Sequence, residues 1–255
     1  TRLQGDWSSD VCSSDLIGIL AVIGIIYGAL GCLAQTDMKR LIAFSSVAHM
    51  GFVMLGISTL TDFGINAALF GMVAHGLITG MLFFVAGSVK HRYHTLEISR
   101  LSGMLIQMPR LGWILGFAAM ASLGLPGLAG FWGEFPAILS AYNPNFGLSE
   151  ALFRTLMVIA AIGTVFAAAY LLWLYQRTAF GRPNPEFDQH AHPVGAGVND
   201  EHHEVDIHDV TKIEWIAWTP FLIAIVVFGV YPQLMFGVMD PAVSLLIERV
   251  GAGIP

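Results

Sequence analysis

One carboxylate, Glu134, stands inside a long apolar stretch, directly after the run Gly-Leu-Pro-Gly-Leu-Ala-Gly-Phe-Trp-Gly. Between Leu111 and Tyr142 no other side chain is ionisable except Tyr142 itself. A carboxylate at membrane depth costs several kcal/mol and is usually kept for ion or proton handling. Pro126 and four nearby glycines interrupt the helix expected here, and broken helices that line a cavity are typical of transporters. The pattern indicates a membrane protein that translocates charge.

Two histidines lie in neighbouring apolar stretches, His49 within Leu41–Leu60 and His75 near the middle of Ile65–Val89. Histidine titrates near neutral pH and can pass a proton through either ring nitrogen. One alternative is a pair of core histidines that only complete their own hydrogen bonds. Another is a zinc site shared with Glu134, but the spacing fits no local metal motif. Because no other acidic or basic side chain lies at comparable depth, the three residues favour a proton relay, and no metal site is expected.

A second group of ionisable residues lies in the stretch 181–213, where histidines alternate with acids. The group consists of His190, His192, His202, His203 and His208 with Asp200, Glu201, Glu204, Asp206 and Asp209. Such clusters can bind divalent metals. The glycines and the proline in the same stretch, however, are typical of a solvated loop. We expect adventitious metal affinity here and no functional metal site.

The elements that must position these residues are membrane-spanning helices. Apolar residues make up 55% of the chain and charged residues 12%, with a mean hydropathy of +0.68, whereas soluble domains carry roughly 25% charged residues. A bilayer core needs about 20 apolar residues, and runs of this length exclude barrel strands. The predicted fold class is therefore all-α, a polytopic transmembrane helical bundle. Its six spans are Ile17–Ala34, Leu41–Leu60, Ile65–Val89, Leu111–Tyr142 (broken), Leu152–Tyr175 and Trp215–Met239.

Lysine and arginine predict the orientation of the bundle. Nine of the eleven basic residues after Leu16 fall in or beside the stretches that follow the first, third and fifth spans. Loops rich in Lys and Arg stay on the cytoplasmic side. We therefore expect a multi-pass protein of the plasma membrane with its C-terminus on the external side.

The first residues of the chain differ from the rest. Asp6–Leu16 is polar, stops abruptly against Ile17, and resembles one reading frame of a common sequencing-adapter oligonucleotide. We expect residues 1–16 to be non-native and exclude them from the fold; a solvated N-terminal segment is the alternative. The chain would then be a fragment that begins inside a longer protein. Cys32 is left as a single cysteine, which excludes a disulfide framework.

Three motifs resemble the antiporter-like subunits of the bacterial NADH–quinone oxidoreductase, respiratory complex I. They are the run QTDMKRLIAFSSVAHMG at 35–51, Ala74-His75-Gly76-Leu77, and Gly124-Leu125-Pro126-Gly127 followed by Gly133-Glu134-Phe135. The resemblance covers the chain from Ile17 to its C-terminus. It implies a second five-helix inverted repeat at 17–180, a cytoplasmic loop at 181–213, and at 214–255 a closing helix with an external C-terminal tail.

The resemblance also implies a function. In this family a proton route passes through histidines to an ionisable group in a broken helix, which is glutamate in one subunit and lysine in its sisters. Glu134 fits the glutamate type, and His49 and His75 match the relay histidines. The first repeat, with its central lysine, is missing from this sequence.

The expected partners are neighbouring antiporter-like membrane subunits of complex I and the lipid bilayer, with no nucleic acid. No nucleotide-binding loop or cysteine cluster is present, so this chain is expected to hold no cofactor. Flavin, iron–sulfur clusters and quinone are expected on other subunits. Two alternatives stay open: a subunit of a multi-subunit cation/proton antiporter, and a purely structural membrane subunit.

Overall fold

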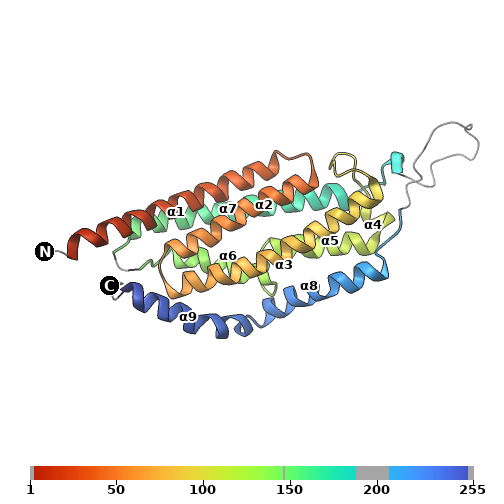
Figure 1. Ribbon diagram of the computed structural model, residues 1–255. Coiled ribbons are helices and arrows are strands. Elements are labelled where there is room, and N and C mark those ends of the chain that lie inside the picture. Colours follow the sequence, from red (N-terminus) through yellow and green to blue (C-terminus); the bar gives the residue numbers. More distant parts are fainter. Residues whose placement is uncertain (1–2, 146, 188–206, 252–255) are drawn as a thin grey trace, which may run out of the picture.

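The computed structural model describes residues 3–145, 147–187 and 207–251. These residues form a bundle of helices that run side by side along one axis and contain no β-strand (Figure 1), which confirms the all-α fold class. The elements are α1 (Leu3–Leu33), α2 (Met38–Ser58), α3 (Asp62–Tyr93), α4 (Met104–Gln107), α5 (Pro109–Ser122), α6 (Ala129–Ser140), α7 (Glu150–Ala179), the 3₁₀ turn η1 (Pro185–Phe187), α8 (Lys212–Val230) and α9 (Gln233–Gly251).

Five stretches of single helix in the described part of the chain are long and apolar enough to cross a membrane. They are Ser13–Leu33, Met38–Ser58, Asp62–Tyr93, Glu150–Ala179 and Lys212–Val230. Helices α5 and α6 are each too short to cross alone, and together they occupy the predicted broken span. The predicted spans are therefore all helical, and the chain is a multi-pass membrane protein.

The broken span is interrupted between Ser122 and Ala129. Gly124 and Gly127 take positive φ angles of 71° and 93°, which residues with a side chain rarely adopt. Pro126 lies between them and has no backbone N–H to continue a helix. The glycines and the proline that mark this break in the sequence are therefore the residues that create it.

The last span differs from the prediction. The sequence predicts one continuous span over Trp215–Met239, but α8 ends at Val230 and a separate helix, α9, begins at Gln233. Pro232 is the physical reason, because it lacks an N–H and disfavours helical backbone at the residue before it. Tyr231 accordingly has φ −127° and ψ 70°. The prediction of one unbroken final helix is wrong, and the segment expected as a tail is helical as far as Gly251.

The connecting segments gather at the two ends of the bundle. At one end, Ile98 donates its backbone N–H to Thr36, and Gly103 donates to Phe180. At the other end, Asn145 donates to Thr59. The basic stretches after the first, third and fifth spans thus share one end, as the charge pattern predicts, while the assignment of that end to the cytoplasm stays a prediction.

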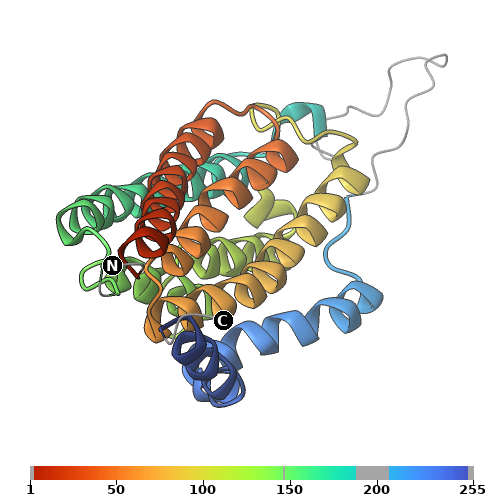
Figure 2. The same cartoon turned by 60° about the vertical axis from the view of Figure 1, so that its left-hand side comes forward.

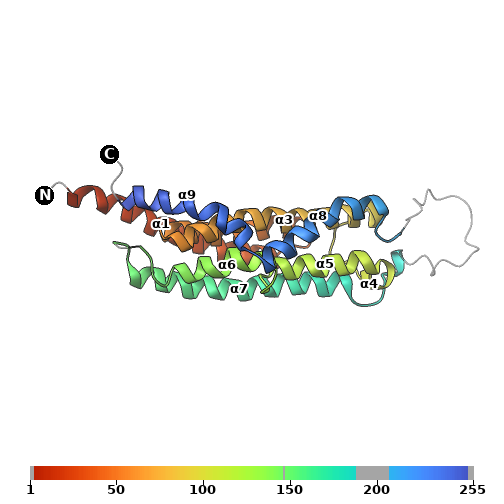
Figure 3. The same cartoon turned by 90° about the horizontal axis from the view of Figure 1, so that it is seen from below.

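Two layers make up the bundle. Figure 3 shows α5, α6 and α7 in one layer and α1 to α3 with α8 and α9 in the other. In Figure 2, α8 and α9 follow the side of the bundle formed by α3, away from α7. The proposed functional residues lie where the two layers face each other.

The predicted division of the chain remains a prediction. Helix α1 runs without interruption from Leu3 through the boundary placed after residue 16. Most of the His- and acid-rich loop, at 188–206, lies outside the described residues. Of the histidines predicted there, the structure describes His208.

Candidate proton-relay site

The site is built around a direct contact between Glu134 of α6 and His49 of α2. Glu134 Oε1 lies 2.6 Å from His49 Nδ1. The His49 side chain is 5% exposed and that of Glu134 is 14% exposed. The two residues are 85 positions apart in the sequence, so the fold brings together the two groups that the sequence singles out separately.

The second ring nitrogen of His49 contacts two hydroxyl groups from the other layer. His49 Nε2 lies 3.1 Å from Ser122 Oγ at the end of α5, and 3.3 Å from the Tyr170 hydroxyl on α7. Both hydroxyls are buried. A hydroxyl group can donate or accept a hydrogen bond, so each can pair with either tautomer of the imidazole. His49 therefore joins four helices: α2, α5, α6 and α7.

His75 lies beside this pair but is bonded to different residues. Its Nε2 is 3.1 Å from Ser46 Oγ on α2, and its Nδ1 is 3.2 Å from Thr79 Oγ1, one turn further along α3. The ring centroids of His75 and His49 are 5.4 Å apart, with a tilt of 42°. The third predicted residue thus lies next to the other two, and a proton passing between the imidazoles would need a bridging group.

A small cavity lies among the three residues. It is lined by His49, His75, Ser122 and Glu134 together with apolar residues of α2 and α3 and glycines of α3 and α6. The centre of a water molecule has about 20 Å³ of space in it, which is room for about one water. Polar groups from several sides make the cavity suitable for a single water that bridges the carboxylate and the imidazoles.

Glycines place Glu134 in this position. A Cβ added at Gly133 would overlap with Gly71 of α3, and one added at Gly130 would overlap with the carbonyl of Ala121. Small residues let helices approach closely in membranes. Helix α6 therefore lies directly against α3 and the end of α5, which carries Glu134 into the interior of the bundle.

The hydroxyl groups of the site are not predicted by any pattern in the sequence. Ser46 lies within the quoted motif at 35–51 but carries no signal of its own there. Ser122, Tyr170 and Thr79 are ordinary residues of apolar helices. Their roles follow from helix rotation, which uniformly apolar stretches do not reveal.

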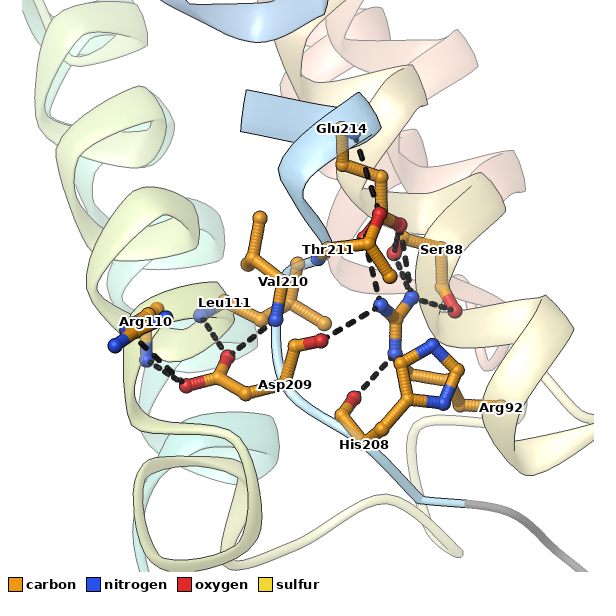
Figure 4. A network of polar contacts seen from close by, with 9 residues as sticks. All are labelled: Ser88, Arg92, Arg110, Leu111, His208, Asp209, Val210, Thr211 and Glu214. Atoms are coloured by element: carbon orange, nitrogen blue, oxygen red, sulfur yellow. Dashed lines mark hydrogen bonds and ion pairs between the residues drawn. The ribbon is translucent and has the colours of Figure 1, made fainter. Parts of the chain in front are cut away.

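A buried ion-pair network at the basic end of the bundle was also not predicted (Figure 4). The Arg92 side chain on α3 is 1% exposed, and its guanidinium lies 2.7 Å from Glu214 Oε2 at the start of α8. The same guanidinium donates to Ser88 and to the backbone carbonyls of His208 and Asp209. Ser88 Oγ in turn lies 2.5 Å from Glu214 Oε1. In the sequence, Arg92 is one of the basic residues that predict the orientation of the bundle.

The segment before α8 also caps the broken helix. The Asp209 carboxylate accepts hydrogen bonds from the backbone N–H groups of Arg110 and Leu111, at 3.1 and 3.2 Å. These groups belong to the first turn of α5, which has no side-chain cap from its own N-cap residue. The network therefore connects α3, α5 and α8 at one end of the molecule.

The sequence is similar to known families and proteins. Residues 3–170 match the family described as NADH:quinone oxidoreductase/Mrp antiporter, TM. NADH-quinone oxidoreductase subunit M of Rhodobacter capsulatus is 38% identical over 231 residues, which are 91% of this chain and 40% of that protein. NAD(P)H-quinone oxidoreductase chain 4 1 of Synechococcus elongatus is 35% identical over 241 residues, 94% of this chain and 42% of the relative.

Solved structures agree with this assignment. A chain of respiratory complex I from Thermus thermophilus with bound NADH matches with a TM-score of 0.77 and 28% identity, over 94% of this chain and 45% of that one. A chain of the Mrp complex from Dietzia has the same fold, with a TM-score of 0.77 at 17% identity over 95% and 49% of the two chains. The chain spans about 40% of the length of the curated relatives it matches. It belongs to the NADH:quinone oxidoreductase/Mrp antiporter transmembrane family.

Proposed function

We propose that this chain is part of a proton-translocating membrane subunit of an NADH:quinone oxidoreductase. In this proposal, quinone reduction on other subunits drives proton movement, and flavin, iron–sulfur clusters and quinone are bound there. This chain would carry no redox group and would act with neighbouring antiporter-like subunits in the bacterial plasma membrane. The 2.6 Å contact between Glu134 and His49 inside a broken-helix site is the observation that carries the proposal.

The chemistry of the site suits proton transfer because each polar group in it can both give and take a proton or hydrogen bond. A carboxylic acid, two imidazoles and several hydroxyls meet this condition. A buried carboxylate favours its protonated form, and a positive charge beside it favours the ionised form. A protonated His49 would supply such a charge at Glu134 and remove it on losing its proton. Loading and release of a proton would thus need little movement of the backbone.

The route would continue from His49 towards His75 through the cavity, and then to Ser46. Ser46 also lines an apolar groove between α1 and α2 with a volume of about 500 Å³. In this proposal the groove side of α2 faces the rest of the translocation path. Glu134, which lines the same cavity, would exchange its proton with the external face.

The test is Glu134→Gln in the assembled enzyme, with Glu150→Gln as the matched control. Glutamine keeps the size of the side chain but cannot ionise. Glu150 is an exposed carboxylate at the start of α7 that pairs with Arg154 four residues later. Proton uptake by energised vesicles and NADH-driven quinone reduction are measured together. We expect pumping to be lost in the first variant and kept in the second. Normal pumping stoichiometry in Glu134→Gln would exclude the relay.

The family description also includes Mrp antiporters, so a subunit of a cation/proton antiporter is the second candidate. Proton flux that requires a sodium gradient, and is independent of NADH oxidation, would favour it. A purely structural subunit would tolerate simultaneous replacement of Glu134, His49 and His75 without loss of pumping.

A further inference from the structure

The break between α8 and α9 lies against the break between α5 and α6. Gly229, in the last turn of α8, is buried. A Cβ added to it would overlap with the carbonyl of Gly127 and with Cα of Leu128. Figure 3 shows the junction of α8 and α9 bending towards the junction of α5 and α6. The end of the last span thus rests directly on the backbone of the broken helix.

A hydrogen bond fixes this contact. The indole Nε1–H of Trp132, on α6, donates to the carbonyl oxygen of Gly229 at 2.8 Å. In a helix that continued past Gly229, this oxygen would accept from the backbone N–H four residues later. The Trp132 ring also meets Phe236 of α9 edge-on, with ring centroids 6.3 Å apart. Both sides of the α8–α9 break therefore hold Trp132.

Three consecutive residues of α6 contact three different helices. Trp132 bonds to α8, Gly133 lies against Gly71 of α3, and Glu134 bonds to His49 of α2. Successive side chains on a helix point about 100° apart. Trp132 and Glu134 thus project from nearly opposite sides of α6. A helix held in this way cannot rotate about its axis without breaking one of the contacts.

We propose that Trp132 and Gly229 are positioning residues that set the rotation of α6 and so hold Glu134 against His49. The helix outside the five-helix repeat would then determine the environment of the proton carrier inside it. This inference deepens the proposed function and rests on it. The geometric part, that α8 controls the position of Glu134, can be tested separately from pumping.

The experiment uses the whole chain in lipid nanodiscs and a hydrophobic carbodiimide, which reacts with protonated carboxyl groups. Peptide mapping measures the labelling rate of Glu134 across a pH series. Trp132→Phe removes the N–H and keeps an aromatic ring, and Gly229→Ala adds one methyl group at the contact. Gly237→Ala is the matched control, because its nearest neighbour is the flexible Gln233 amide at 3.8 Å.

We expect Glu134 to be labelled about fivefold faster at neutral pH in Trp132→Phe and in Gly229→Ala than in the wild type. A fivefold change is what the loss of one hydrogen bond produces. Their labelling profiles should move along the pH axis, and the double variant should change no more than the larger single one, because both changes remove the same contact. Gly237→Ala should match the wild type. Wild-type profiles in both single variants would overturn the inference, as would additive effects.

Two further measurements separate this inference from the proposed function. Unfolding of each variant is followed by circular dichroism, and Trp132→Phe is the milder change if Gly229→Ala does not fold. Pumping by the same variants is measured in the assembled enzyme. Altered labelling with normal pumping in Glu134→Gln would retain the positioning role and reject the relay. Unaltered labelling in Trp132→Phe and Gly229→Ala, together with loss of pumping in Glu134→Gln, would reject the positioning role and retain the relay.

Discussion

Two buried polar regions of the molecule differ in the kind of groups they contain. The network at the basic end centres on Arg92, whose guanidinium donates to Glu214, to the Ser88 hydroxyl and to three backbone carbonyls. The mid-span site centres on His49, which contacts Glu134, Ser122 and Tyr170. Both regions connect distant segments of the chain through a central side chain that is almost fully buried.

The difference lies in whether a hydrogen bond can reverse its direction. A guanidinium only donates and keeps its proton in proteins, and a backbone carbonyl only accepts. The bonds of Arg92 to Glu214 and to the carbonyls thus have one possible polarity, and the network can hold helices together but cannot pass a proton through itself. Imidazole, carboxyl and hydroxyl groups can exchange roles. A buried polar cluster is therefore classified by its residue types rather than by its burial.

The largest effect on stability is expected for Arg92→Met. The change removes the charge, leaves Glu214 with part of its bonding unsatisfied, and releases the segment before α8. Breaking a buried ion pair costs about 3–5 kcal/mol; because the Glu214 side chain is 23% exposed, we expect about 3 kcal/mol. Unfolding in detergent, followed by circular dichroism, measures it. Arg110→Gln is the control, since Arg110 is 65% exposed and 4.0 Å from Asp209, and should cost less than about 1 kcal/mol.

The next largest effect is expected for His49→Gln, and it should concern pumping. Glutamine can bond to Glu134 and Ser122 but cannot titrate, so a relay through this position should stop. Loss of a general acid–base group lowers rates by about a hundredfold or more. Pumping rate in vesicles and unfolding in detergent are compared for the same variant. If the loss of pumping in His49→Gln were fully explained by a loss of stability, His49 would be a structural group like Arg92.

A smaller effect is expected for Asp209→Ala, which removes the cap of α5. Loss of a helix cap costs about 1 kcal/mol, and here the cap comes from a distant segment. The midpoint of thermal unfolding should fall while the pumping rate of the folded enzyme stays unchanged. Asp209→Asn should restore only part of the stability, because Arg110 and Leu111 donate to different oxygens of the carboxylate and the amide keeps only one acceptor oxygen. Reduced pumping in an Asp209 variant of full stability would show that the network at the basic end affects the site around His49.

The smallest effects are expected for Tyr170→Phe and Ser122→Ala. Both hydroxyls contact the same nitrogen of His49, so each can replace the other. Each single variant should lower pumping by about threefold or less, within the value of one hydrogen bond. The double variant should lower it by more than the product of the two single effects, since Nε2 then has neither hydroxyl. Purely multiplicative effects would show that the hydroxyls act independently.

The sequence predicts the elements well where local chemistry decides them. Hydrophobic length predicted the spans, and Pro126 with Gly124 and Gly127 predicted the break before Glu134. Pro232 carried the same kind of signal for the break after α8, but the long apolar run around it favoured one continuous span. A proline in an apolar run does not by itself predict a break, since Pro136 and Pro220 lie inside continuous helices; at Pro232 the break follows because Tyr231 leaves the helical conformation.

By itself, the sequence determined an all-α membrane bundle of this family and the broken helix, and it singled out Glu134, His49 and His75 as candidates for a proton relay. Only the tertiary structure decided that Glu134 bonds to His49, and that His75 turns to Ser46 and Thr79. It also decided the pairing of Arg92 with Glu214. The physical reason is that hydrophobicity and backbone preference act locally. Helix rotation and contact between helices depend instead on how side chains fit across the whole bundle, which uniformly apolar segments do not encode in any local pattern.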